Sequence, residues 1–504
     1  MVHVYLKLTG LIFLIIFAAV RAEGADWIEV TSDHFQLTTD LPEKRALEVV
    51  DQLEKTRLAL AYLTRKEPNE NAPIFRIFGF QKTGDYLRIS GIKRTAGYFT
   101  YAWDGPVSLS SLARPDGQWG MSGLQIAIHE YVHFFMRSIN GAQYPIWYDE
   151  GFADFISTMR FEEDRAIIGD AHPNRIYGLA VTPNWMDFSK ILTRKATGKR
   201  RDSMIYSVGW LLTHYLWEDA ERTATLNRYL QAYSTDSSDP VKVFEDTFGI
   251  TPKQMDKELR SYWKKGQLRV GSFSLDAFKQ PIKKTVRRFN KLESKAMPYR
   301  AMVVGHSRSL DNNGIRKKAI KAFEALYKAQ SDDVDEALMI GELQSHSPDT
   351  PEDALTTIDA ALASNQSDPR LATFRLYTES FSNPIGSMAK TEVSAYKKLL
   401  DGAIDAAPDY IPARFARARL ALSPFQPVTE QTLADMNMVS EKWPGNVGLT
   451  TDYARLAMKT GNYSLARSLL VRLRGSARGE RFSQTLDQLL ATIDAVLDAD
   501  ANAS

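Results

Sequence analysis

The segment LQIAIHEYVHFFMRSINGAQYPIWYDEGFADFISTM, residues 124–159, constrains the fold of this chain more than any other. Two histidines, His129 and His133, stand four residues apart in an apolar run that predicts a helix over about 122–139. Residues four apart share one face of a helix, so both imidazoles point to the same place. This spacing suits two ligands of one tetrahedral Zn²⁺ ion. Glu130 can reach the open position of such a metal, where the general base for a zinc-activated water stands.

A third ligand is offered by Glu150, seventeen residues after the second histidine. It falls in the first turn of a second predicted helix, which begins near Tyr148 and runs to about residue 159. The connection contains Asn140-Gly141 and Pro145, which can turn the chain so that the second helix returns beside the first. Catalytic zinc sites take three protein ligands and leave one position open. Asp154, one helical turn after Glu150, is expected to accept the N–H of a ligating histidine and fix its tautomer.

The pattern HEYVH, then a helix break, then EGFAD resembles the gluzincin pattern HExxH…ExxxD. WYDEGFADF is similar to the W-x-x-E-G-x-A segment of aminopeptidase-N-like enzymes and of the peptidase-MA-like families. A weaker similarity runs from WIEVTSDHFQL through AGYFT to YSVGWLLTHYL. The resemblance implies a zincin-like domain in which His129, His133 and Glu150 bind zinc, Glu130 is the base and Asp154 supports a ligand. It does not extend to aminopeptidase action, because the ligand gap is slightly shorter and no G-x-M-E-N segment is present.

An oxyanion donor, about 3 kcal/mol in favour of the transition state when well placed, is expected downstream of the third ligand. Tyr206 and His214, both on a helix predicted over 205–217, are the candidates. Tyr206 is favoured because the family counterparts resemble it at the start of this helix. Tyr148 and His172 are lesser options.

The N-terminus predicts export. Residues 1–7 carry one lysine, residues 8–20 form an uncharged apolar run, and small residues precede position 23. The run spans only about 20 Å as a helix, short of the roughly 30 Å hydrocarbon core. We expect a cleaved signal peptide at 1–22 and no membrane span after its removal. An uncleaved anchor is the alternative, since Arg21 is unusual so close to a cleavage site.

The chain contains no cysteine, which excludes disulfides, thiolate metal ligands and a cysteine nucleophile. A secreted or periplasmic protein of a bacterial cell envelope fits this composition. The formal net charge of +2 gives no reason to expect a nucleic-acid partner. Short basic clusters such as Lys199-Arg200-Arg201 are interpreted as solvated surface.

The order of predicted elements indicates an α+β catalytic domain over 23–267. Strands predicted at 27–39, 74–80 and 96–101 and a helix at 42–64 precede the histidine segment, and helical patterns dominate from 206 to about 265. Residues 268–310, with Pro281, Pro298 and a basic run, are interpreted as a connector with some strand and no assigned function.

Residues 311–504 are almost entirely helical in pattern. Helix pairs are punctuated by Asp332, Pro369, Pro408 and Pro444, 36 to 39 residues apart. YARLAMKTGNYSLARSLL has Gly, Tyr and Ala where a tetratricopeptide repeat needs them, so a TPR-like all-α solenoid is expected. An unrelated helical bundle is the alternative.

We therefore expect an exported zinc-dependent metallopeptidase that hydrolyses a peptide or protein substrate, with a protein partner on the repeats. Two alternatives remain open. One is a catalytically inactive TPR-like scaffold carrying a vestigial peptidase domain, and the other is a zinc amidase acting on cell-wall peptide. A purely structural zinc is disfavoured, because such sites close the fourth position with Cys or His and no such ligand is near.

Overall fold

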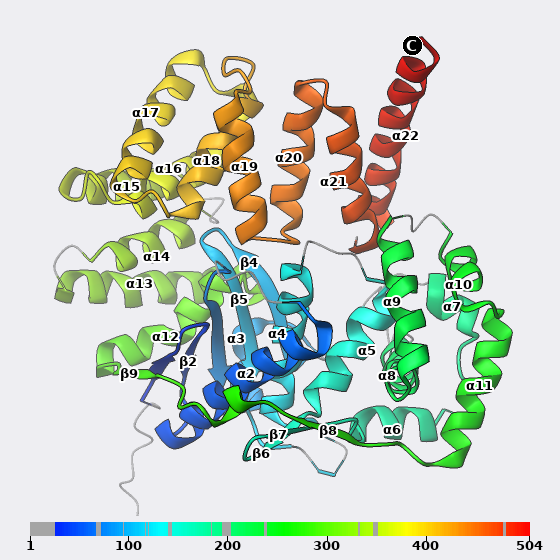
Figure 1. Ribbon diagram of the computed structural model, residues 1–504. Helices are drawn as coiled ribbons and strands as arrows, with labels where there is room; N and C mark the ends of the chain where they lie inside the picture. Colours follow the sequence, from blue (N-terminus) through cyan, green and yellow to red (C-terminus); the bar gives the residue numbers. More distant parts are fainter. Residues whose placement is uncertain are drawn as a thin grey trace, which may run out of the picture.

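The computed structural model describes residues 26–66, 72–93, 95–115, 117–118, 120–139, 144–182, 184–193, 203–235, 239–330, 333–345, 351–476 and 480–503 (Figure 1). Four features of the sequence lie outside these residues: the predicted signal peptide at 1–22, the Asn140-Gly141 turn, the Lys199-Arg200-Arg201 cluster and Asp332.

A mixed six-stranded sheet, in the order β4-β5-β3-β2-β1-β9, forms the centre of the N-terminal half. β2 and β3 pair in parallel, as do β3 and β5, and the other neighbours are antiparallel. The strands are β1 (Ile28–Thr31), β2 (Phe35–Thr39), β3 (Phe75–Phe80), β4 (Gly97–Ala102), β5 (Gly105–Ser111) and β9 (Thr285–Arg288). A second sheet of three strands contains β6 (Arg160–Glu162), β7 (Arg165–Ile168) and β8 (Gly271–Ser274).

Helices cover both faces of the larger sheet. In β3, Phe75 and Ile77 belong to one core with α2 (Glu43–Thr64) and α4 (Gly123–Ser138). Phe78 and Phe80 belong to the opposite core with α3 (Thr83–Ser90) and α12 (Lys291–Val304). Successive side chains of a strand point to opposite faces, so a strand buried on both sides is apolar throughout, as FRIFGF nearly is.

The segment 268–310 does more than connect. It contains strand as expected, but β8 completes the small sheet and β9 pairs with β1 at the edge of the large one. Pro298 lies inside α12 rather than in irregular chain. The N-terminal sheet therefore depends on residues beyond position 267.

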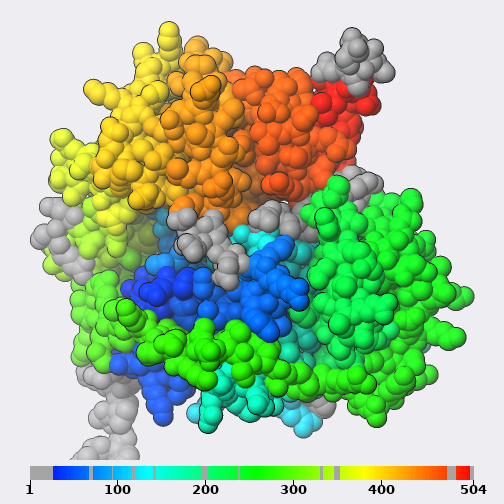
Figure 2. Space-filling view, viewed as in Figure 1, coloured from blue at the N-terminus to red at the C-terminus, as the bar shows by residue number. Residues whose placement is uncertain are grey.

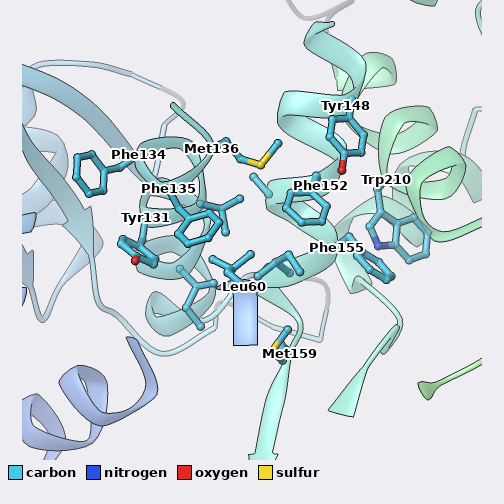
Figure 3. Packing of buried hydrophobic residues seen from close by; sticks show 14 of the residues in the cluster. Leu60, Tyr131, Phe134, Phe135, Met136, Tyr148, Phe152, Phe155, Met159 and Trp210 are labelled. Atoms are coloured by element: carbon cyan, nitrogen blue, oxygen red, sulfur yellow. The ribbon is translucent and has the colours of Figure 1, made fainter. Parts of the chain in front are cut away.

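The two helices of the histidine segment form as expected. A capping box between Ser122 and Gln125 starts α4. The helix α5 (Ile146–Ser157) starts two residues earlier than predicted, because the Pro145 carbonyl accepts the N–H groups of residues 148 and 149. Figure 3 shows Met136 of α4 and Phe152 of α5 pointing into the core that joins the helices.

Further helices lie between α5 and β8 in the described part of the chain. They are α6 (Pro173–Ala180), α7 (Phe188–Thr193), α8 (Ser203–Trp217), α9 (Ala220–Thr235), α10 (Pro240–Phe248) and α11 (Pro252–Lys265). α8 packs along α5 and completes its burial, and Trp210 of α8 and Phe155 of α5 belong to the same core (Figure 3).

The C-terminal part is helical, and consecutive helices pack side by side (Figure 1). Pro369 stands at the start of α16, while Pro408 and Pro444 lie between helices. We call the helices from α13 onward the helical array: α13 (Asn313–Gln330), α14 (Val334–Ser345), α15 (Pro351–Ser364), α16 (Pro369–Ser382), α17 (Lys390–Ala406), α18 (Ile411–Arg419), α19 (Glu430–Lys442), α20 (Val447–Lys459), α21 (Tyr463–Ser476) and α22 (Glu480–Ala503). The chain is thus α+β and mainly helical.

The β4–β5 hairpin contacts the end of α12 and the helical array, which packs on the N-terminal part (Figure 2). The Tyr98 hydroxyl donates to the carbonyl of Gly305, and the Tyr101 hydroxyl donates to the carbonyl of Pro444, at 2.8 and 2.7 Å. Trp103, at the tip of the hairpin, lies 5.2 Å from the ring of Phe374 in α16.

Among the described helices, none combines the length and apolar character required to cross a membrane.

Candidate metal centre

Three side chains from α4 and α5 converge on one point. The Nε2 atoms of His129 and His133 lie 3.2 Å apart, and Oε2 of Glu150 lies 3.3 Å from the first and 3.4 Å from the second. All three residues are buried. The two helices thus bring together the three residues that the sequence predicts as metal ligands.

The triangle formed by these atoms has the size that a zinc site requires. Bonds of about 2.0–2.1 Å in tetrahedral geometry separate any two ligand atoms by about 3.3–3.4 Å. The three separations are 3.2, 3.3 and 3.4 Å. Two imidazole nitrogens and one carboxylate oxygen are also a donor set typical of catalytic zinc. The residues present therefore fit a tetrahedral divalent cation.

A carboxylate contacts the Nδ1 atom of each imidazole. His129 Nδ1 lies 3.1 Å from Oδ1 of Asp154, and His133 Nδ1 lies 3.1 Å from Oδ1 of Asp149. The second pair is a hydrogen bond, whereas the first is an ion-pair contact whose alignment falls short of one. Carboxylates at Nδ1 favour the tautomer in which Nε2 is free to bind a metal.

Two arginines hold these carboxylates in turn. Arg175 of α6 makes a bidentate pair with Asp154 at 2.5 and 3.0 Å, and Arg137 of α4 contacts Asp149 at 3.2 Å. At Asp154 the charge of Arg175, and at Asp149 the charges of His133 and Arg137, outweigh the effect of burial and hold the pKa of both aspartates below its usual range. Both aspartates are therefore ionised near neutral pH.

Negatively charged groups outnumber positively charged groups around the centre. The four carboxylates of Glu130, Glu150, Asp149 and Asp154 face two guanidinium groups, so neutral imidazoles leave a formal charge of −2. Burial alone lowers the pKa of His129, but Asp154 and Glu150 outweigh it and raise this pKa to about 10. The centre thus favours added positive charge, which a divalent cation would balance.

Glu130 lies under the first residue of the edge strand β4. A Cβ atom on Gly97 would stand 3.1 Å from its Oε1 and 3.2 Å from its Cγ, so glycine allows the strand to approach the carboxylate. His129 and Glu130 keep 8% and 9% of their surface exposed, more than Glu150 with 2%.

The candidate oxyanion donors lie in different surroundings. The ring of Tyr206 lies 5.0 Å from the guanidinium of Arg175, which binds Asp154, so Tyr206 borders the centre. Both ring nitrogens of His214 are engaged elsewhere: Nε2 lies 3.0 Å from the Gly169 carbonyl and Nδ1 lies 2.9 Å from the Tyr262 hydroxyl. The structure therefore places Tyr206 against Arg175, whereas both ring nitrogens of His214 have partners outside the candidate ligand set.

The two lesser options serve packing and capping. Tyr148 is buried and stacks on Phe152. His172 is fully buried, and its Nδ1 accepts the N–H of Arg175 as the N-cap of α6. Its Nε2 lies 3.6 Å from Asp154.

Three supporting residues were not identified from sequence. Asp149 directly precedes Glu150, and this adjacency was the available signal. Arg137 stands four residues after His133 at the end of α4. Arg175 carries no local signal, because α6 reaches Asp154 only through the tertiary fold.

Glu150 lies in the second turn of α5 rather than the first, since the helix begins at Ile146.

Comparisons with protein-family models, with curated proteins and with solved structures find no match for this chain. The function is therefore argued from the geometry and charge of the centre.

Proposed function

We propose that this chain is a zinc-dependent metallopeptidase whose metal is held by His129, His133 and Glu150. The observation that carries the proposal is the triangle of ligand atoms, with sides of 3.2, 3.3 and 3.4 Å, that suits tetrahedral zinc. The formal charge of −2 that neutral imidazoles leave around it and the carboxylate beside each imidazole support the same conclusion.

A bound Zn²⁺ would supply Lewis-acid chemistry, polarising water and the carbonyl group of a scissile peptide bond. The protein residues divide the remaining tasks. Glu130 accepts a proton from the attacking water and donates it to the leaving amine nitrogen, acting first as general base and then as general acid. Asp149 and Asp154 keep the two imidazoles oriented. The hydroxyl of Tyr206 donates a hydrogen bond to the oxygen that gains negative charge.

The wider features belong to the same proposal. Residues 23–267 are assigned a zincin-like fold, and the helical array a TPR-like one that offers a surface to a protein partner. The signal at 1–22 would export the protein to the periplasm or beyond. A peptide or protein is the proposed substrate.

Hydrolysis of a mixed peptide library, followed by mass spectrometry, tests the activity. Zinc-loaded wild-type protein should generate new termini, and the Glu130→Gln variant should keep its zinc but lose cleavage. A parallel incubation with cell-wall peptides distinguishes the amidase alternative. If wild type and Glu130→Gln are equally inert on both substrate sets, the scaffold alternative replaces the peptidase proposal.

A further inference from the structure

A tight turn of the helical array lies against the outer layer of the metal centre. The turn Trp443-Pro444-Gly445-Asn446 joins α19 to α20 and is closed by a 3.3 Å hydrogen bond from the Asn446 N–H to the Trp443 carbonyl. Pro at the second position and Gly at the third, with φ of +75°, are typical of a type II turn. Asn446 also caps α20, and Trp443 is buried, so the turn is fixed to its own helices.

Two contacts join this turn to the N-terminal part. A Cβ atom on Gly445 would stand 2.9 Å from both Cβ and Cδ of Arg137, so the turn backbone lies directly against the stem of this arginine. The Tyr101 hydroxyl of β4 donates to the Pro444 carbonyl at 2.7 Å. Figure 1 shows the α19–α20 connection above β4 and α4.

Arg137 contacts both this turn and His133, one of the proposed metal ligands. Its Nη1 donates to the carbonyl of His133 at 2.9 Å, and its Nη2 lies 3.2 Å from Oδ2 of Asp149. The other oxygen of Asp149 lies 3.1 Å from Nδ1 of His133. On a further side, the guanidinium lies 5.8 Å from the ring centroid of Phe99. One side chain thus contacts β4, α5 and the helical array.

We propose that Arg137 is a positioning residue for His133, and that the Trp443–Asn446 turn holds Arg137 in place. The inference rests on the proposed zinc site. Arg137 fixes Asp149, and Asp149 fixes the orientation of the His133 imidazole. Because the turn limits where the arginine stem can move, docking of the helical array and zinc affinity are coupled. The array is then a part of the metal centre's support, and loosening the turn weakens zinc binding without touching a ligand.

The first test compares two tyrosines of one strand in the full-length protein. Tyr101→Phe removes the hydrogen bond to Pro444, beside Arg137. Tyr98→Phe is the matched control, because it removes the same kind of bond, to Gly305, away from Arg137. Zinc affinity is measured by competition with a chromophoric chelator. We expect Tyr101→Phe to weaken zinc binding a few-fold and Tyr98→Phe to leave it unchanged.

The second test compares two glycines with the same backbone conformation. Gly445 and Gly461 have φ of +75° and +74°, but no described atom lies within 4 Å of a Cβ built on Gly461. Both alanine variants therefore carry the same backbone strain, and only Gly445→Ala presses on Arg137. We expect Gly445→Ala alone to weaken zinc affinity. Arg137→Ala should weaken it roughly tenfold, as loss of an outer support does.

Combining the variants tests whether the turn affects zinc affinity through Arg137. In an Arg137→Ala background, Gly445→Ala and Tyr101→Phe should have no further effect on zinc affinity. Equal zinc affinities of the test and control variants in both pairs, or an undiminished effect without Arg137, would overturn the inference while leaving the zinc site intact. Wild-type protein that binds no zinc would overturn the proposed function, and this inference with it.

Discussion

Gly151 of α5 and Gly209 of α8 meet backbone to backbone. A Cβ atom on Gly151 would overlap the carbonyl group of Gly209, and one on Gly209 would overlap the carbonyl of Trp147. The glycine that follows Glu150 is thus required by packing. It lets α8 press against the helix that carries the third ligand.

Gly151→Ala should therefore destabilise the fold by about 1–3 kcal/mol, since overpacking forces the backbones apart. It should also weaken zinc binding, because Glu150 is the adjacent residue. Urea denaturation and chelator competition measure the two effects. Gly402→Ala in α17 is the control: no described atom lies within 4 Å of its Cβ position, so alanine should stabilise by about 0.5–1 kcal/mol. Equal effects of the two substitutions would contradict the packing explanation.

Removing the charge of Asp154 should weaken the metal centre. Asp154→Asn loses the ion pair with Arg175 and the carboxylate behind His129, so zinc affinity should fall by about 10–100-fold. Asp149→Asn should act in the same way through His133. Asp187→Asn, which removes an exposed ion pair with Lys190, is the control and should change nothing. Unchanged affinity in Asp154→Asn would show that the carboxylate does not support the ligand.

The candidate ligands could be predicted from sequence because they depend on local geometry. His129 and His133 share a helix face, and Glu150 follows on the next helix, so spacing and one turn were sufficient. Asp154 followed from the same periodicity. The residues that hold these groups, Arg175 above all, come from elements whose approach is set by tertiary packing.

Two strands of the large sheet also could not be predicted from local sequence patterns. The sequence does not predict β5, because GPVSLSS begins with the turn signal Gly-Pro and its apolar-polar alternation covers only residues 107–110. β9 lies in the segment that the sequence indicates as a connector with some strand, because Pro281, Pro298 and a basic run surround the short TVRR. Its pairing with β1 joins residues about 250 positions apart in the chain, which no local pattern reveals.

Substitution of Tyr206 should lower kcat, whereas substitution of His214 should lower stability. Tyr206→Phe should lower kcat on a cleaved peptide by roughly 10²–10³-fold, with zinc retained, since it loses the proposed oxyanion donor. His214→Gln should instead cost about 1–3 kcal/mol of stability, because two buried hydrogen bonds are lost, and should leave kcat near the wild-type value. A large loss of kcat in His214→Gln with normal stability would reverse the assignment.

His172 should make the metal-free protein sensitive to acid. Burial lowers the pKa of His172 to about 4, below the value of about 6.5 in an unfolded chain. Between these values the unfolded state binds a proton that the folded state refuses, so stability falls as pH drops from about 6.5 to about 4, by up to roughly 3 kcal/mol. His172→Asn keeps an N-cap acceptor and cannot titrate. Its unfolding free energy, measured by urea titration across this range, should depend less on pH, and an unchanged dependence would contradict the assignment.

The most direct test of the account is the zinc content of the purified, zinc-loaded protein and of its Glu150→Ala variant, measured by elemental analysis with folding checked by circular dichroism. We predict one zinc ion per chain in the wild type and in Glu130→Gln, and none in Glu150→Ala. A folded Glu150→Ala protein that retains as much zinc as the wild type, or a wild type that retains none, would contradict a metal centre formed by His129, His133 and Glu150.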